Sequence, residues 1–190
     1  MKKVYGTDRR EENMNLPNKL TILRIILIPL MAVLYFCGLH YAAAAVFLIA
    51  VITDVLDGKI ARKHNLVTVF GKFLDPIADK LLNLSALLLV IWYQPNIFVT
   101  VCTMIIIARE FLVTGFRIVA ASNQIIIAAD RLGKIKTIVQ DVAIIFLMIE
   151  NWPFSFIGVP VDMILLGAAA LMTIISGVNY IAKNAAVFKE

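Results

Sequence analysis

Long apolar runs alternate with short polar joints along most of this 190-residue chain. Each run is close to the about 20 residues that a helix needs to cross the hydrocarbon layer of a membrane. Strands are disfavoured because the runs are long and continuous, and because an open sheet cannot satisfy its backbone in lipid. The pattern predicts an all-α integral membrane bundle of six transmembrane helices, over residues 20–38, 41–60, 73–93, 96–121, 135–150 and 158–182.

Basic residues distinguish the two sides of this predicted bundle. Lysine and arginine occur near both chain ends and in the joints that follow the second and fourth helices. The other three joints contain neither residue and carry aromatic residues instead, namely Tyr41, Trp92, Tyr93 and Trp152. Basic residues favour the cytoplasmic side, and tryptophan and tyrosine favour membrane interfaces. We therefore expect a cell-membrane protein with both termini in the cytoplasm and a short cytoplasmic segment before the first span.

The composition agrees with a membrane protein. The chain is 61% hydrophobic and 16% charged, whereas soluble domains are about 45–50% apolar and about 25% charged. The net charge of +5 is interpreted as the cytoplasmic excess of basic residues, and no nucleic-acid partner is expected. Residues 1–13 are polar and lack the apolar stretch of a signal peptide, so they are expected to be a disordered or expression-derived tail. Residues 14–190 are expected to form a single domain.

Four aspartates lie where the second helix ends and the third begins: Asp54, Asp57, Asp75 and Asp79. A charge inside a spanning helix costs about 2.5–3.5 kcal/mol and usually marks function. Residues three or four positions apart share a helix face, and the short joint makes the two helices antiparallel neighbours. Four converging carboxylates must be protonated or bind cations, and oxygen ligands favour magnesium, manganese or calcium. The alternative is that they form only rim ion pairs, with Lys59, Arg62, Lys72 or Lys80.

Small residues and one arginine complete a spaced pattern around these aspartates. Gly58, Ala61, Arg62 and Gly71 occupy fixed distances from them. Glycine permits close approach of a phosphate to the backbone, and the planar fork of arginine suits phosphate binding. The whole run, DVLDGKIARKHNLVTVFGKFLDPIAD, resembles the signature of the CDP-alcohol phosphatidyltransferase family at every fixed position.

This resemblance covers about residues 14–185 and implies a reaction at a CDP-lipid. It implies that Asp54, Asp57, Asp75 and Asp79 bind two divalent cations, Mg²⁺ or Mn²⁺, which bridge the diphosphate of CDP-diacylglycerol. It also implies that Asp79 is the general base for the attacking alcohol. The residues that it assigns to CDP-diacylglycerol binding are Pro17, Asn18, Lys19, Leu20, Thr21, Gly58, Ala61, Arg62, Thr68 and Gly71, with Arg24 as a further contact.

Cations of the fourth and fifth helices favour a phosphorylated acceptor, because they would otherwise face one another. The stretches NLPNKLTILRI, AREFLVTGFR, LGKIKT and SGVNY are similar to those of bacterial phosphatidylglycerophosphate synthases. That similarity implies sn-glycerol 3-phosphate as the acceptor and CMP as the product released. It assigns the acceptor phosphate to Arg109, Arg117, Lys134 and Lys136.

Other functions remain open at this point. The acceptor could be inositol phosphate, serine or phosphatidylglycerol within the same family. A small cation transporter would carry its acids near the bilayer midplane, and a scaffold protein would not need an intact motif. Contact with membrane lipids is expected, and a homodimer is compatible with a bundle of polar helices.

Overall fold

The computed structural model describes residues 16–64, 69–122 and 131–184. For residues 16–17, 56–64, 69–73, 121–122 and 131 it describes the backbone alone. The elements are α1 (Leu16–Phe36), α2 (His40–His64), α3 (Val69–Tyr93), α4 (Ile97–Ser122), α5 (Arg131–Met148), a short 3₁₀ turn η1 (Phe154–Ile157) and α6 (Val161–Lys183). The predicted all-α class is confirmed, and each of the six predicted helices is present.

The helices differ from the prediction mainly at their polar ends. α2 continues to His64 and α3 begins at Val69, so both helices extend beyond the apolar runs from which they were predicted. α5 begins at Arg131, before its apolar run. Backbone hydrogen bonding does not depend on hydropathy, so a helix continues where its side chains become polar.

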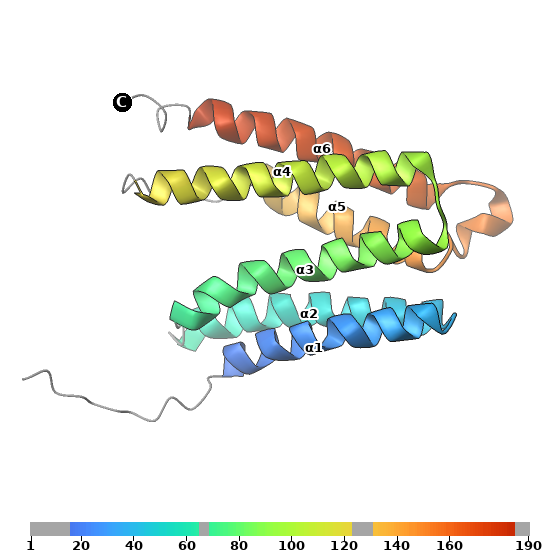
Figure 1. Ribbon diagram of the computed structural model, residues 1–190, viewed down its shortest axis with the longest axis horizontal. Helices are drawn as coiled ribbons and strands as arrows, with labels where there is room; N and C mark the ends of the chain where they lie inside the picture. The colour runs from blue at the N-terminus through green and yellow to red at the C-terminus, as the bar shows by residue number, and fades with distance from the viewer. Residues whose placement is uncertain (1–15, 65–68, 123–130, 185–190) are drawn as a thin grey trace, which may run out of the picture.

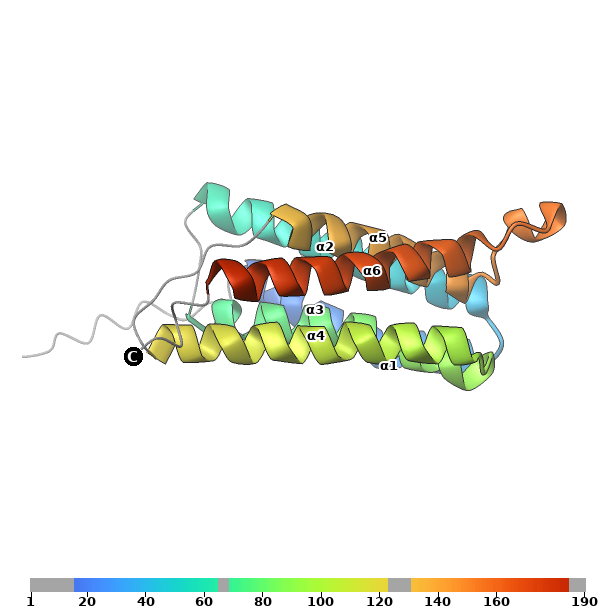
Figure 2. The same cartoon turned by 90° about the horizontal axis from the view of Figure 1, so that it is seen from above.

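The six helices form two packed groups (Figure 1). α1 packs mainly on α2 and α3, and α6 packs mainly on α4 and α5. α5 also contacts α2 and α3 and thereby joins the groups, whereas α3 and α4 touch only sparsely. All six run along one long axis, as the view from above shows (Figure 2). We call the end at which α1 begins and α6 ends the polar end, because the functional candidates lie towards it.

One apolar core runs through both groups. Fully buried side chains come from all six helices, with Met31, Phe47, Leu82, Ile106, Ile144 and Leu166 as examples. Burying a side chain of this kind stabilises a protein by about 1.5–3 kcal/mol in water. Within lipid, the stabilisation comes instead from dispersion contacts between packed side chains. The core therefore fixes the helix positions from which the polar side chains project.

The outer surface is strongly apolar, as lipid contact requires. Large hydrophobic side chains are exposed on every helix, from Ile26 on α1 to Val178 on α6. Three helices are long and apolar enough to span a membrane by themselves, over Asn18–Phe36, Ile97–Ala120 and Val161–Lys183, and α2 adds the shorter apolar stretch His40–Val55. Soluble proteins do not expose this much apolar surface to water, so the chain is a multi-pass membrane protein.

At the end opposite the polar end, the buried side chain of His40 is the centre of a cluster of interacting side chains. His40 at the start of α2 lies 2.8 Å through Nδ1 from Oε1 of Glu150, in the connection after α5. Its ring contacts the rings of Tyr35 and Tyr93, with centroids 4.6 and 4.2 Å away. The preceding turn needs Gly38, whose φ of 76° is rarely adopted by other residues. This cluster connects α1, α2 and α3 to the second group.

Candidate active site

Helix α1 contributes two fully buried polar side chains to the acidic region. Thr21 and Arg24 lie one turn apart, and α1 packs against both α2 and α3. Nη1 of Arg24 lies 2.8 Å from Oδ1 of Asp54 on α2. Thr21 donates a hydrogen bond through Oγ1 to Oδ1 of Asp75 on α3. The first helix therefore links the two helices that carry the predicted metal ligands.

The described carboxylates of α2 and α3 lie close enough to repel one another. Asp54 acts electrostatically on Asp79 and experiences the charge of Asp75, while the charge of Arg24 reaches both Asp54 and Asp79. The side chain of Asp54 keeps 40% of its surface exposed, so a ligand can reach it. Carboxylates that repel one another are stabilised when a cation binds between them, and their oxygens are the ligands that divalent metal ions prefer.

The remaining predicted ligand is Asp57, whose side chain lies outside the described residues. Its place on α2, three residues after Asp54, keeps the helical spacing that the prediction used. Among the described side chains, no group of three or more His, Cys, Asp or Glu residues is arranged to hold a metal ion. The four-aspartate metal site therefore stays a prediction, with three of its members placed in one region.

The predicted contacts to CDP-diacylglycerol are only partly described. On α1, Asn18 and Thr21 are buried, Lys19 is exposed, and Leu20 is half-buried. The others have side chains outside the described set or, in the case of Thr68, lie wholly outside it: Pro17, Gly58, Ala61, Arg62, Thr68 and Gly71. The described residues thus place the start of α1 beside the aspartates, and the remaining contacts stay predictions.

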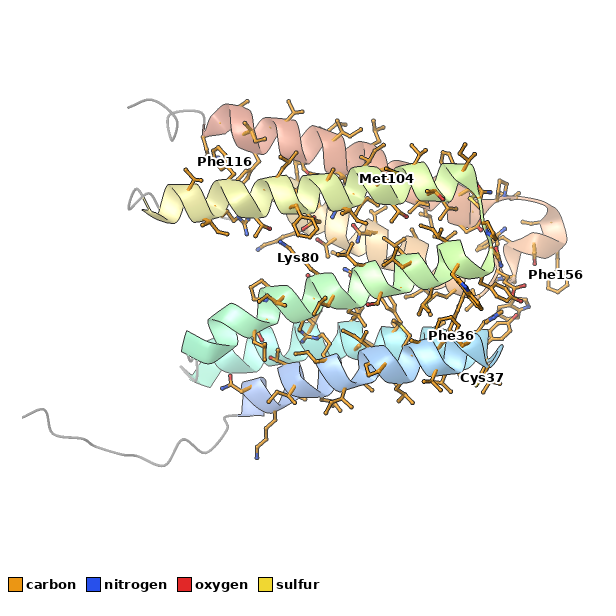
Figure 3. The ribbon with its side chains drawn as sticks, in the orientation of Figure 1. Phe36, Cys37, Lys80, Met104, Phe116 and Phe156 are labelled. Atoms are coloured by element: carbon orange, nitrogen blue, oxygen red, sulfur yellow. The ribbon has the colours of Figure 1, made fainter. Side chains whose placement is uncertain are left out.

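A cavity of about 240 Å³ lies between α3, α4, α5 and α6 and reaches Asp79. Three of the four cations that were predicted to hold the acceptor phosphate line it, namely Arg109, Arg117 and Lys134. Lys80 lines it as well and extends between α3 and α4, where its Nζ donates to Oγ1 of Thr114 (Figure 3). Sequence reasoning had considered Lys80 only as a rim partner of the aspartates. The predicted base and four cations therefore share one space.

Lys136, the fourth predicted phosphate ligand, forms an ion pair with the half-buried carboxylate of Glu110. Its Nζ donates to Oε1 of Glu110 at 2.7 Å, and its side chain is only 3% exposed. Nη1 of Arg109 lies 3.0 Å from the same oxygen, and Nζ of Lys80 lies 3.8 Å from Oε2. A carboxylate shared by three cations orients them and offsets part of their charge. Direct contact between Lys136 and an acceptor stays a prediction, although Lys136 and Asp79 both line an adjoining cavity of about 30 Å³.

Asp141 on α5 is an acid that sequence reasoning missed. The side chain of Asn83 on α3 hydrogen-bonds to it, and the charges of Asp79 and Lys136 act on it. Its Oδ1 has no hydrogen-bond partner among the described atoms. The signal that could have identified it is the presence of an acid within an apolar helical run, which is costly unless it has a role.

The sequence that forms this site matches a known protein family. Residues 14–175 match the family model described as CDP-alcohol phosphatidyltransferase. The chain belongs to this family. The matched range includes α1 to α5 and most of α6, with every aspartate and cation described above. CDP-alcohol phosphatidyltransferases use divalent metal ions, and the carboxylate oxygens of Asp54, Asp75 and Asp79 are donors of the type that such ions prefer.

Individual members of the CDP-alcohol phosphatidyltransferase family match the chain over nearly its whole length. A CDP-diacylglycerol–glycerol-3-phosphate 3-phosphatidyltransferase of Bacillus subtilis (strain 168) is 42% identical over 185 residues, which are 90% of this chain and 95% of the relative. The protein of that name from Rickettsia typhi is 42% identical over 170 residues, covering 87% and 94%. The one from Wigglesworthia glossinidia brevipalpis is 30% identical over 172 residues, covering 88% and 93%.

Proposed function

We propose that this protein transfers the phosphatidyl group of CDP-diacylglycerol to sn-glycerol 3-phosphate, giving phosphatidylglycerophosphate and CMP. The observation that carries the proposal is the cavity in which Asp79 faces Lys80, Arg109, Arg117 and Lys134. A space that joins a carboxylate to several cations suits an acceptor with a hydroxyl at one end and a phosphate at the other. The names of the relatives specify the same reaction.

The aspartates are the residues that would hold the metal ions. Asp54, Asp57, Asp75 and Asp79 would provide carboxylate oxygens to two divalent cations, Mg²⁺ or Mn²⁺, and the repulsion of Asp54 with Asp75 and with Asp79, which a bound cation would relieve, supports this assignment. Bound divalent ions neutralise diphosphate oxygens and make the attacked phosphorus more electrophilic. Arg24 and Thr21 hold Asp54 and Asp75 in place from α1.

Asp79 would act as the general base. An alcohol is a weak nucleophile near neutral pH and reacts faster when a carboxylate accepts its proton. Asp79 is the one aspartate of the four that lines the acceptor cavity among the described side chains. It can therefore meet an acceptor hydroxyl from the cavity while the CDP group occupies the side near Asp54. The hydroxyl oxygen then bonds to the β-phosphorus, the bond to CMP breaks, and CMP leaves with the electron pair.

The cations would bind the phosphate of the acceptor. Arg117 and Lys134 line the cavity, and Arg109 and Lys80 line it while also contacting Glu110. Several donors that converge on one anion give charge-assisted hydrogen bonds and fix its distance from the base. Serine and other uncharged acceptors would leave these cations facing one another, which disfavours them as substrates.

The orientation in the membrane follows from the charges of the sequence. The polar end collects the basic joints and both ends of the described chain (Figure 1), and basic residues favour the cytoplasm. We place the polar end at the cytoplasmic face of the bacterial cell membrane, with all six helices spanning it. A water-soluble acceptor then arrives from the cytoplasm while the acyl chains of CDP-diacylglycerol remain in lipid.

The acceptor is tested with purified protein in detergent, supplied with CDP-diacylglycerol, Mg²⁺ and one acceptor at a time. CMP release should be fastest with sn-glycerol 3-phosphate, and slower with inositol phosphate, serine or phosphatidylglycerol. The control is Asp79→Asn, which should release no CMP above background with any acceptor. Faster release with serine or with inositol phosphate than with glycerol 3-phosphate would refute the choice of acceptor.

A further inference from the structure

Both arginines that α4 directs to the acceptor cavity are held by α6. We propose that Ser176, Gly177 and Tyr180 are positioning residues, which fix the guanidinium groups of Arg109 and Arg117 for a single phosphate. This inference rests on the proposed function, because it concerns acceptor binding in the cavity described above. The sequence stretch that contains them, SGVNY, was used only for the resemblance, and none of the three residues was given a role in the site.

Tyr180 holds Arg117 in two ways. Nε of Arg117 donates a hydrogen bond to the Tyr180 hydroxyl at 3.0 Å, and the guanidinium carbon lies 5.4 Å from the centroid of the Tyr180 ring. The ring itself is buried and is oriented by an edge contact with Phe116, 5.9 Å away. Because the bond uses Nε, the two terminal nitrogens of the planar fork are presented to an oxyanion.

Ser176 and Gly177 hold Arg109. Nη2 of Arg109 donates to Oγ of Ser176 at 3.1 Å, and that hydroxyl donates in turn to the carbonyl of Thr173 at 3.2 Å. A Cβ atom added at Gly177 would lie 3.0 Å from Cγ of Arg109. The Arg109 side chain therefore passes over α6 at Gly177, where α6 has no side chain. Any larger residue at this position would displace the Arg109 side chain.

The spacing of these contacts makes the two guanidinium groups converge. Arg109 and Arg117 are eight residues apart on α4, which is about 12 Å along the helix axis. Their anchors Ser176 and Tyr180 are four residues apart on α6, about 6 Å along the axis. The anchors on α6 are therefore closer together along the axis than the arginines that they hold, and both arginines line one cavity. Glu110 lies 3.0 Å from Arg109 and offsets part of this positive charge, and a phosphate in the cavity would offset the rest.

Packing alone would also produce contacts between α4 and α6, so the experiment must separate binding from stability. The test variants are Tyr180→Phe, which keeps the ring and removes the hydroxyl, and Gly177→Ala. The matched control is Gly167→Ala, since its Cβ would lie 3.2 Å from Cζ of Phe98, a contact between the same two helices outside the cavity. A second control is Gly115→Ala on α4, where a Cβ would meet nothing within 4 Å.

CMP release is measured while glycerol 3-phosphate and CDP-diacylglycerol are titrated separately, and melting temperatures are measured in the same detergent. Tyr180→Phe and Gly177→Ala should each raise KM for glycerol 3-phosphate about tenfold, the effect of losing one charge-assisted hydrogen bond. KM for CDP-diacylglycerol should change less than about twofold in the same variants. Both controls should leave both KM values unchanged, whatever their effect on melting.

A double-mutant cycle tests whether Tyr180 acts through Arg117. In an Arg117→Lys background, which lacks Nε, Tyr180→Phe should raise KM for glycerol 3-phosphate no further. Equal increases of both KM values, unchanged KM values in both test variants, or a full further effect in the Arg117→Lys background would overturn the inference. A wild-type protein that released no CMP with glycerol 3-phosphate would refute the proposed function itself, and this inference with it.

Discussion

The half-buried carboxylate of Glu110, which pairs with three cations, should be the most sensitive electrostatic position among the described residues. It is 2.7 Å from Nζ of Lys136 and 3.0 Å from Nη1 of Arg109, and the Lys136 side chain is almost completely buried. Removing one member of a buried ion pair leaves an uncompensated charge and costs about 3–5 kcal/mol. In a protein of this size each kcal/mol lowers the melting temperature by about 2–4 °C, so Glu110→Ala should melt about 10 °C lower.

Thermal unfolding of purified variants in one mild detergent, followed by near-ultraviolet circular dichroism, measures this loss. Glu110→Gln keeps the shape of the side chain and removes the charge, so it should lose a large part of the same stability. The double variant Glu110→Gln/Lys136→Met removes both charges and should melt above Glu110→Gln alone. Lys183→Gln, at an exposed lysine of α6, is the control and should melt within about 2 °C of wild type. The argument fails if Glu110→Gln behaves like Lys183→Gln, or if the two substitutions in the double variant are simply additive.

Three further predictions concern the reaction. Asp79→Asn should lower kcat for CMP release at least about a hundredfold, the usual contribution of a general base, while the melting temperature stays close to wild type; near-normal turnover would remove Asp79 as the base. Excess EDTA should stop CMP release and added Mg²⁺ or Mn²⁺ should restore it, so activity that is indifferent to chelation would contradict a metal site. Lys134→Ala should raise KM for glycerol 3-phosphate about tenfold and leave KM for CDP-diacylglycerol unchanged; equal changes in both would exclude Lys134 as an acceptor ligand.

The helices could be predicted because each apolar run is bounded by charges or turn residues. Gly38, with its positive φ, ends the turn after α1 where the sequence placed a joint. Helix ends at the polar end could not be predicted as well, because α2 continues to His64 through residues whose hydropathy no longer signals a helix. Charged residues at that end also explain why, within the part of the chain that the structure describes, three helices are apolar enough to be recognised as spans by hydropathy and length alone.

Residues that are close in sequence were easier to place in the site than residues that meet across helices. The spacing of the aspartates follows from helix geometry, and the structure places Asp54 within electrostatic reach of both Asp75 and Asp79. The pairing of Lys136 with Glu110 joins positions 26 residues apart, and hydropathy contains no information about which faces of α4 and α5 meet. The sequence predicted contact between Lys136 and the acceptor phosphate, which stays a prediction, but gave no sign that Lys136 also pairs with Glu110.

α3 and α4 contact each other only sparsely, so direct packing between them does not determine the width of the proposed acceptor site. Asp79 belongs to the first helix group and Arg109 and Arg117 to the second, so no single helix determines how far the proposed base lies from these cations. α5 contacts α2 and α3 as well as α6, so its packing relates the two groups. Under the proposed function, substitutions on the buried face of α5 would change the length of alcohol that fits while every proposed reacting group stays the same. The size of the substrate would then depend on helix packing as well as on the groups proposed to bind it.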